Sequence, residues 1–420
     1  MTAALDERPE ATAALPRSIP PWTLVAGAMF AVAWGGNEFT PLLVMYRLDH
    51  GYSPVVVDSF LFAYVLGIVP AMLIGGPLSD RLGRRPLMLP APFVAAAGSL
   101  VLAVGADSAA LLIVGRVLSG VGLGLGMAVG GSWLKELSAR PWDVKARTGA
   151  GARRAAMSLT AGFAIGAGLA GVLAQWAPWP SALAYALHIL LAVGAGVALL
   201  AAPESRAATP VAERVALIED LKIPAASHRR FWFVIAPVAP WVFGAASCAY
   251  AVMPSLMADH SGGRPVAFSS LLCVVALACG FGVQALGRRI DTPHSARAVL
   301  VALAILVVGM VIGAAAADRL TVPLALLAAV VLGSGYGMAL VSGLQEIQRI
   351  AGPDDLAGLT AVFYSLTYLG FAVPAAMAIA VQEWSGVLGY PVIFLFGAVV
   401  AAASLALVAV KSRSHLPECA

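Results

Sequence analysis

The chain has 420 residues, of which 60% are hydrophobic and only 11% are charged, and its formal net charge is +4. Its mean hydropathy is +0.88. About 25% of the residues of a typical soluble domain are charged, so this composition excludes an ordinary soluble protein. Because a run of about 20 apolar residues crosses a bilayer as a helix, we expect an all-α membrane protein.

Apolar runs of membrane-spanning length recur along the whole chain. There are twelve of them, with approximate extents 22–45, 57–78, 87–106, 108–133, 154–176, 181–202, 231–256, 266–286, 297–316, 321–344, 357–380 and 390–410. The residues before the first run include acids and prolines, and they lack the charged-then-apolar layout of a signal peptide. The sequence therefore predicts twelve transmembrane helices after a short cytoplasmic tail.

The distribution of Lys and Arg predicts the orientation in the membrane. With the N-terminus inside, the predicted cytoplasmic segments hold 22 of the 26 Lys and Arg residues. Such an excess in short loops decides topology. We therefore expect a multi-pass protein of the cell inner (cytoplasmic) membrane with both termini in the cytoplasm. The positive net charge then reflects orientation in the lipid bilayer, and we expect no nucleic acid as a partner.

The densest cluster of charged and turn residues lies between the second and third runs. Residues 76–86 read G-P-L-S-D-R-L-G-R-R-P. A tight basic turn between two spans belongs on the cytoplasmic side, and Pro86 can begin a helix because the first helical residue needs no N–H partner. This stretch resembles motif A of the major facilitator superfamily. The resemblance implies that the motif locks and releases two helix bundles, through Gly76, Asp80, Arg81, Gly83, Arg84 and Arg85.

A weaker copy of this stretch occurs half a chain length downstream. Residues 280–289 read G-F-G-V-Q-A-L-G-R-R, with Gln284 and Ala285 in place of the Asp-Arg pair. Such a repeat predicts two related halves, although a chance G-R-R in a basic loop is the alternative. The resemblance implies the major facilitator fold of two pseudo-symmetric six-helix bundles. The expected parts are a tail at 1–19, bundles at 20–202 and 231–411, a central cytoplasmic loop at 203–230 and a tail at 412–420.

The central loop is the longest polar segment between the runs. It begins with Pro203-Glu204-Ser205, which resembles a proline–glutamate element that often follows the sixth helix of the family. Further on, Val211 to Leu221 could form a short amphipathic helix on the membrane surface. A flexible tether is an equal alternative.

Two charged residues lie deep within the predicted spans. Glu38 is in the first, and Arg116 begins the sequence R-V-L-S-G-V-G in the fourth, which resembles the family's motif B. A charge in a span is costly and normally marks function. Since the two residues lie at matching depth, we expect a proton-coupling pair in which protonation of Glu38 frees Arg116. The alternatives are a permanent structural ion pair and an arginine that reaches the outer interface.

Other ionisable residues near the helix ends receive simpler interpretations. Asp58 is expected in water at the outer end of the second span, and Glu346 is expected to pair locally with Arg349, three residues away. We interpret His188 as a packed, hydrogen-bonded histidine. The cysteines and histidines show no metal-ligand or disulfide spacing, so the sequence indicates no cofactor and no metal.

In the family that motif A resembles, helices 1, 4, 7 and 10 line a central cavity. Mapped onto this chain, the cavity has charges on one wall and aromatic and hydroxyl groups on the other. The candidate substrate-cavity residues are Trp34, Asn37, Ser119, Trp241, Tyr250, Tyr336, Tyr364 and Tyr368. Packing without substrate contact is the alternative for each of the aromatic residues.

These observations favour a transporter over an enzyme, since no extramembrane domain and no nucleophile–base pattern is present. The first hypothesis is proton-coupled export of a small, fairly apolar organic molecule by a monomeric carrier. The second is proton-coupled uptake of a metabolite, and the third is a non-transporting sensor on the same fold. A sparse aromatic cavity with one acid favours export. However, residues 166–171, G-A-G-L-A-G, lack the proline of the family's antiporter motif C.

Overall fold

The computed structural model describes residues 19–210, 223–352, 355–414 and 416. About 81% of the described residues are helical, and the described ranges contain no β-strand, only an isolated bridge between Thr292 and Ser295. Most of the predicted N-terminal tail, part of the C-terminal tail and the segment Val211 to Leu221 lie outside the described residues.

The first six predicted spans are all helical. They comprise α1 (Pro21–Asn37), η1 (Thr40–Leu42) and α2 (Leu43–Asp49); α3 (Pro54–Leu82); α4 (Arg84–Met88) and α5 (Pro90–Val104); α6 (Ala109–Leu125), η2 (Gly126–Gly130) and α7 (Gly131–Leu137); α8 (Ala150–Trp176); and α9 (Leu183–Leu199). The first span is interrupted after Asn37 because Pro41 has no backbone N–H to donate back to that turn. Glu38 lies at this interruption, where α1 ends.

The second six spans follow a short turn, η4 (Pro224–Ser227). They comprise η5 (Phe231–Ile235), α11 (Ala236–Ser247), η6 (Cys248–Val252) and α12 (Met253–Leu256); α13 (Pro265–Ile290); α14 (Arg297–Arg319); α15 (Val322–Ile350); α16 (Leu356–Tyr368), η8 (Leu369–Ala372) and α17 (Val373–Glu383); and α18 (Tyr390–Lys411), with η7 (Ala258–His260) in a loop. Ten helical segments of the described chain are long and apolar enough to cross a membrane, and α9 is a shorter apolar helix.

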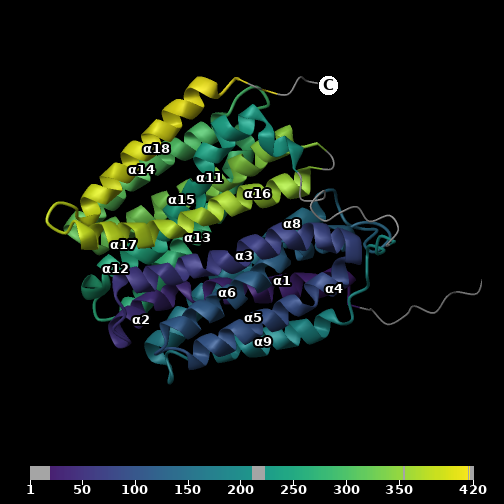
Figure 1. Cartoon of the computed structure of the whole chain (residues 1–420), viewed down its shortest axis with the longest axis horizontal. Helices are drawn as coiled ribbons and strands as arrows, with labels where there is room; N and C mark the ends of the chain where they lie inside the picture. Colours follow the sequence, from purple (N-terminus) through teal and green to yellow (C-terminus); the bar gives the residue numbers. More distant parts are fainter. Residues whose placement is uncertain (1–18, 211–222, 353–354, 415, 417–420) are drawn as a thin grey trace, which may run out of the picture.

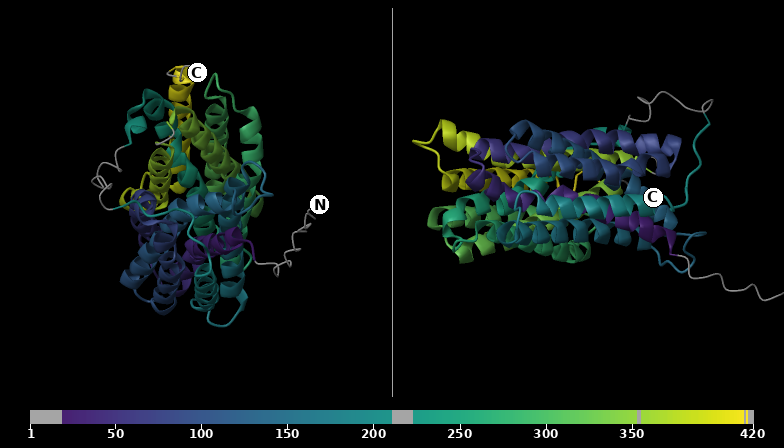
Figure 2. Two further views of the ribbon diagram at one scale, coloured as in Figure 1. Left: turned by 90° about the vertical axis from the view of Figure 1, so that its right-hand side faces the viewer. Right: turned by 90° about the horizontal axis from the view of Figure 1, so that it is seen from below.

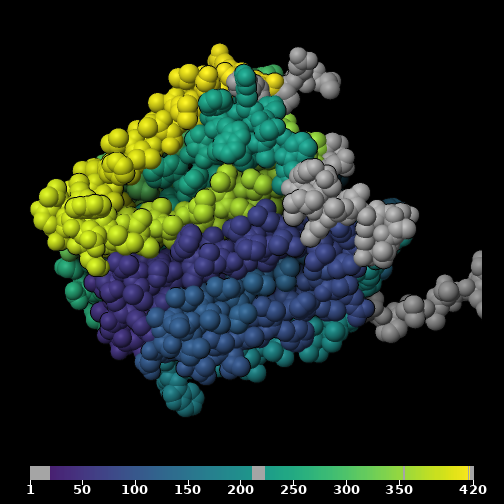
Figure 3. All heavy atoms as spheres, in the orientation of Figure 1, coloured from purple at the N-terminus to yellow at the C-terminus, as the bar shows by residue number. Residues whose placement is uncertain are grey.

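The helices lie in two groups that follow the two halves of the chain (Figures 1 and 2). In the first group α3 packs on α6, α1 on α8, and α5 on both α6 and α9. In the second, α13 and α14 pack on α15, and α14 also packs on α18. The groups meet where α8 packs against α13 and where α3 packs against α16 and α17; Figure 3 shows the long boundary on one face. The predicted fold class, two pseudo-symmetric six-helix bundles, is confirmed.

Many large apolar side chains are exposed on the perimeter of the helices. Val104, Leu190, Phe396 and Val410 are each more than 65% exposed. A soluble monomer rarely exposes so much contiguous apolar surface, whereas lipid tails cover such side chains without cost. The exposed surface therefore agrees with a membrane-spanning protein.

Glycines allow two central helices of the second half to approach closely. At the crossing of α13 and α15, a Cβ atom added to Gly337 would lie 1.9 Å from the carbonyl oxygen of Gly280. Small residues at such crossings permit backbone contact between transmembrane helices. No side chain can therefore be placed at Gly337 without separating α13 from α15.

We expect Gly337→Ala to lower the thermal stability of the purified protein. Overpacking typically costs about 1–3 kcal/mol, and backbone cannot move aside as a flexible side chain can. Gly282→Ala in α13 is the matched control, because an added Cβ there meets nothing within 4 Å. Melting of both variants is followed in detergent by tryptophan fluorescence. Equal melting temperatures for the two variants would show that the crossing tolerates a methyl group.

Candidate functional site

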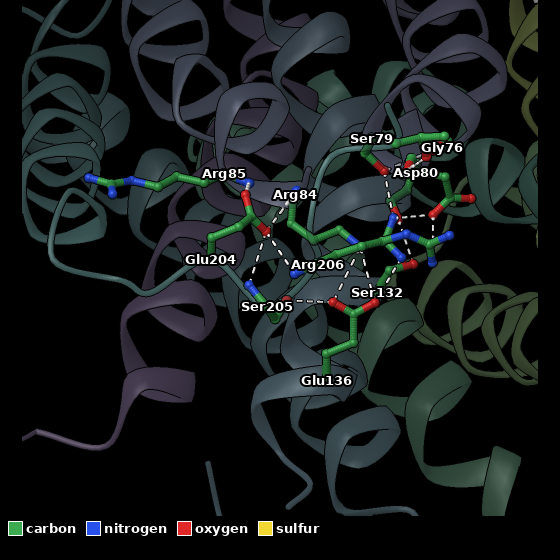
Figure 4. A network of polar contacts seen from close by, with 12 residues as sticks. Gly76, Ser79, Asp80, Arg84, Arg85, Ser132, Glu136, Glu204, Ser205 and Arg206 are labelled. Atoms are coloured by element: carbon green, nitrogen blue, oxygen red, sulfur yellow. Dashed lines mark hydrogen bonds and ion pairs between the residues drawn. The ribbon is translucent and has the colours of Figure 1, made fainter. Parts of the chain in front are cut away.

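Arg84 is buried and is the centre of a polar network at the ends of α3, α4 and α7 (Figure 4). Its Nη1 donates to Asp80 Oδ1 at 2.6 Å and to Ser79 Oγ at 2.7 Å. Its Nη2 donates to Glu136 Oε1 at 2.8 Å. Charge-assisted bonds of this kind are about twice as strong as neutral ones, so Arg84 fastens α3 and α7 to the start of α4.

Glu204, in the connection that follows α9, caps the backbone at the start of α4. Its carboxylate accepts from the N–H groups of Arg84 at 3.0 Å and Arg85 at 2.8 Å. An anion is stabilised there by the unpaired N–H groups of a helix start. Gly83 has a φ of +96°, and a Cβ on it would lie 2.7 Å from Glu204 Oε2. Both the conformation and the space require glycine at this position.

The same connection is tied to motif A at further points. Arg206 Nη1 lies 3.3 Å from Asp80 Oδ1, and Ser205 Oγ donates to Glu136 Oε2 at 2.5 Å. The remaining motif residues lie in the same region: Ser79 Oγ donates to the carbonyl of Gly76 at 2.8 Å, Thr209 N to the carbonyl of Arg81 at 2.9 Å, and Arg85 Nη2 to the carbonyl of Leu200 at 2.7 Å. Motif A is thus joined to the central connection.

The second half has a comparable network at the ends of η5, α13 and α15. Arg230 is buried, and its Nε and Nη2 donate to the two oxygens of Glu346 at 2.6 and 3.0 Å. Glu346 also pairs with Arg349, as the sequence predicted. Arg349 Nη2 lies 3.0 Å from Asp291 Oδ2. Each half therefore has a buried arginine bound by a glutamate near the end of its fourth span.

Glu38 is fully buried within the first half, where it contacts α5 and α9. Ser99 Oγ lies within hydrogen-bond distance of its Oε1, at 2.8 Å, and His188 Nδ1 lies 3.4 Å from the same oxygen. Ser99 Oγ and His188 Nδ1 are themselves 2.7 Å apart. Among the described residues, none makes a hydrogen bond of ordinary geometry to Glu38 Oε2, although the indole of Trp34 lies near the carboxyl group. Glu38 thus shares a compact polar cluster with a hydroxyl and an imidazole.

Arg116 is buried in the same half but has different partners. Its Nη1 donates to the carbonyl of Gly36 at 3.3 Å and its Nε to the carbonyl of Phe60 at 3.4 Å. Its guanidinium lies 4.6 Å from the ring centroid of Phe39 and 4.0 Å from that of Tyr64. Such cation–π contacts stabilise a desolvated cation. Within the described residues, Arg116 makes no ion pair shorter than 4.0 Å with Glu38.

The expectation that Asp58 lies in water is wrong. Only 6% of the residue is exposed, since α3 packs against α16 and α17 of the other half. Cys248 and Tyr390, also from that half, lie close enough for a charge on Asp58 to act on them. The sequence pattern placed Asp58 by its depth in the membrane and could not show which face of α3 meets the second bundle.

The candidate cavity residues fall into two sets. Phe243 stacks with Tyr368, Phe371 and Tyr336 at centroid distances of 4.6, 4.9 and 6.0 Å, and Tyr368 Oη donates across the halves to Met127 Sδ at 3.2 Å. This aromatic cluster lies where the two halves meet.

Several candidates bond mainly to neighbouring helices. Asn37 Nδ2 donates to the carbonyl of Phe163 at 3.2 Å and lies 3.6 Å from Cys273 Sγ of the other half. Ser119 Oγ donates to its own helix, at the carbonyl of Gly115, and Trp241 Nε1 to Ser404 Oγ on α18. Tyr250 and Trp34 are buried, and Tyr364 is half-buried beside Phe363. In the part of the chain that is described, no cluster of His, Cys, Asp and Glu could hold a metal ion.

Sequence reasoning missed Glu136 and did not connect His188 and Ser99 with Glu38. Glu136 and Ser99 lie in the fourth and third spans, and nothing in their local sequence indicates a partner. His188 was expected to be packed and hydrogen-bonded, and it is; its solitary position in an apolar span was the available signal that it has a polar partner.

Comparison with known proteins identifies the family. A family model described as Major Facilitator Superfamily matches residues 23–375. A chloramphenicol resistance protein of Pseudomonas aeruginosa is 26% identical over 336 residues, which cover 79% of this chain and 77% of that protein. An arabinose-proton symporter of Bacillus subtilis is 31% identical over 113 residues, which cover 27% of this chain and 23% of that protein.

Solved structures of transporters share the fold. The POT family transporter PepTSo aligns with a TM-score of 0.73 at 15% identity, covering 95% of this chain and 99% of that one. A mutant of the nucleoside transporter NupG aligns with a TM-score of 0.70 at 11% identity, covering 93% and 98%. The family match, the twelve-helix fold and the motif A network agree: the chain belongs to the major facilitator superfamily and is a membrane transporter, not an enzyme.

Proposed function

We propose that this protein exports a small, fairly apolar organic molecule in exchange for protons. The observation that carries the proposal is the pair of buried ionisable residues in the first half, Glu38 and Arg116. The second half contributes an uncharged aromatic cluster around Phe243. An intramembrane acid is normally kept for a functional purpose. Flat aromatic faces suit an organic ring better than a sugar or an organic anion.

The relative that covers most of the chain supports export, since it is a chloramphenicol resistance protein. Proton-coupled uptake is the second candidate, because the arabinose-proton symporter match is a specific observation in its favour. That match covers about a quarter of the chain. A sensor without transport is less well supported, since motif A is complete and its network is assembled.

In the proposed cycle, Glu38 carries the proton and Arg116 responds to it. With Glu38 neutral, Arg116 is held by two carbonyl groups and two rings. When Glu38 loses its proton, the carboxylate attracts the guanidinium, since opposite charges interact strongly in a medium of low dielectric constant. The resulting movement of α1 against α6 would favour the other facing state and change the affinity for the substrate.

Alternating access would then move the two bundles, 20–202 and 231–411, as bodies joined by the connection 203–230. The networks around Arg84 and Arg230 would hold each bundle rigid at its cytoplasmic end. In this proposal the carrier is a monomer in the cell inner membrane with both termini in the cytoplasm. Its partners are the substrate, protons and the lipid bilayer.

The proposed function is tested by flux in proteoliposomes with an imposed pH gradient. We expect radiolabelled chloramphenicol to move against its own gradient towards the more acidic side, and arabinose to show no such movement. Proton-driven movement of arabinose towards the less acidic side would contradict proton-coupled export and support proton-coupled uptake. If neither probe moves faster than in empty liposomes, a wider panel of aromatic compounds decides between transport and a sensor.

Replacement of Glu38 by glutamine should abolish the acceleration of flux by a pH gradient, because the amide carries no transferable proton. Downhill exchange of the same compound should persist, since the side chain keeps its size. The measurement compares driven flux with exchange in the same liposomes. A variant that remains fully proton-driven would assign the coupling to another residue, with Asp58 as the first alternative.

Replacement of Asp80 by asparagine should reduce flux about tenfold, which corresponds to about 1.4 kcal/mol. The variant loses the attraction of Asp80 for Arg84 and Arg206, while the amide fills the same space. Asp318→Asn, at an exposed aspartate at the end of α14, is the matched control. Expression and melting should match the unmodified protein in both variants. Undiminished flux in Asp80→Asn would show that the motif A network does not need the charge of Asp80 for transport.

A further inference from the structure

Glu38, Ser99 and His188 form a continuous chain of polar atoms inside the first bundle. Ser99 Oγ lies 2.8 Å from Glu38 Oε1 and 2.7 Å from His188 Nδ1. All three residues are fully buried and come from three different helices, α1, α5 and α9. The hydroxyl of Ser99 therefore bridges the carboxyl group and the imidazole.

A hydrogen bond on the far side of the imidazole shows which ring nitrogen carries a proton. His188 Nε2 lies 3.0 Å from the carbonyl oxygen of Ala31. A carbonyl oxygen can only accept, so Nε2 must carry a proton. In a neutral imidazole the other nitrogen, Nδ1, is then an acceptor. Gly35 permits this placement, because an added Cβ there would lie 2.3 Å from the His188 ring.

A count of donors shows that the bridge requires one more proton. If Glu38 were ionised and His188 neutral, Oε1 and Nδ1 would both be acceptors, and Ser99 has only one hydroxyl proton to donate. One of the two buried acceptors would then face the lone pairs of the serine oxygen. A buried polar atom without its partner costs about 1–3 kcal/mol. One additional proton satisfies all three groups.

We propose that Glu38, Ser99 and His188 together bind one exchangeable proton, and that this shared proton is the one that drives transport. In one form the proton is on Glu38 Oε1, which donates to Ser99 Oγ while Ser99 donates to His188 Nδ1. Transfer of the carboxyl proton to Oγ, with transfer of the hydroxyl proton to Nδ1, gives the carboxylate and the imidazolium. The serine keeps one proton throughout, and the total charge of the cluster is unchanged.

The surroundings favour the neutral form in this conformation. In the described chain Glu38 Oε2 accepts no hydrogen bond of ordinary geometry, with only the indole of Trp34 near the carboxyl group. An ionised oxygen without a well-placed donor is more costly to bury than a neutral one. The ionisable groups around the cluster are Arg116 on α6 and the mutually bonded Tyr46 on α2 and Tyr185 on α9. The ionisable residues of α8, Arg153 and Arg154, lie near its start. Arg116 is thus the cation towards which Glu38 would turn once the shared proton leaves.

This inference rests on the proposed proton coupling, but it can be tested without transport. Infrared difference spectra of the purified chain in lipid are recorded over a pH series. The carboxyl band of Glu38 is identified by its loss in Glu38→Gln, and the imidazole bands by their loss in His188→Gln. We expect the two signals to titrate in one step in the unmodified protein, because groups that interact strongly titrate as a pair.

Substitutions of His188 and Ser99 should change the joint titration of the carboxyl and imidazole signals. His188→Gln should shift the midpoint of the Glu38 carboxyl titration by about one pH unit or more, the coupling at which titrations merge. Ser99→Ala should give two separate midpoints, since it removes the bridge and leaves both titrating groups. Ser59→Ala, at a serine that donates to the carbonyl of Val56 in α3, is the matched control and should match the unmodified protein.

The outcomes test the shared proton and the proposed proton coupling separately. A Glu38 carboxyl midpoint that is the same in the unmodified protein, His188→Gln and Ser99→Ala overturns the shared proton. If His188→Gln does not fold, Ser99→Ala, which lacks a single oxygen atom, decides alone. A shared titration together with flux that ignores a pH gradient would support the shared proton and overturn proton coupling. Flux driven by a pH gradient, together with independent titrations of Glu38 and His188, would support proton coupling and overturn the shared proton.

Discussion

Burial of charge is the constraint on which this structure depends. Lipid tails offer no hydrogen-bond partner, so each buried charge must be satisfied by the chain itself. Arg84, Arg116 and Arg230 are all at least 95% buried, and they are satisfied in two different ways. Arg84 and Arg230 are bound by carboxylates, whereas Arg116 is bound by carbonyl groups and ring faces. The three arginines therefore differ in how readily they can change partner.

The two carboxylate-bound arginines, Arg84 and Arg230, tie together helix ends within their own halves. Removing one member of a buried ion pair costs about 3–5 kcal/mol, and this cost applies to Arg230 and Glu346, whose side chains are at most 1% exposed. The side chains of Glu136 and Asp80, the partners of Arg84, are 31% and 43% exposed, so each of those ion pairs contributes less. Neither network, as far as the described residues show, bonds one half to the other. Glu204 and Arg206 bind the central connection to the first half, while Arg230, directly before η5, binds the connection's other end to α15. In the proposed cycle, this arrangement would keep each half rigid while the boundary between them opens.

Much of the fold and part of the site could be predicted from the sequence. The twelve spans follow from hydropathy, because membrane thickness fixes the length of an apolar helix. Motif A was recognisable because its residues are adjacent in sequence, and Arg84 does bond to Asp80 four residues before it. The partners Glu136 and Glu204 were not predicted, since one comes from α7 and the other from the connection after α9, and their positions depend on packing. Asp58 was misplaced for the same reason: depth in the membrane can be read from a sequence, but the direction in which a helix face points cannot.

The separation of Glu38 from Arg116 would be the physical basis of the proposed switch. A tight buried ion pair between them would be hard to break, since its loss costs several kcal/mol. Held apart, each residue has its own set of weaker partners: a hydroxyl and an imidazole for the acid, and carbonyl groups and rings for the arginine. Hydrogen bonds of this kind contribute about 1–3 kcal/mol each, comparable to the free energy of a change of one or two pH units at a single proton site. A proton gradient of ordinary size can therefore decide between the two sets of partners, which a permanent ion pair would not allow.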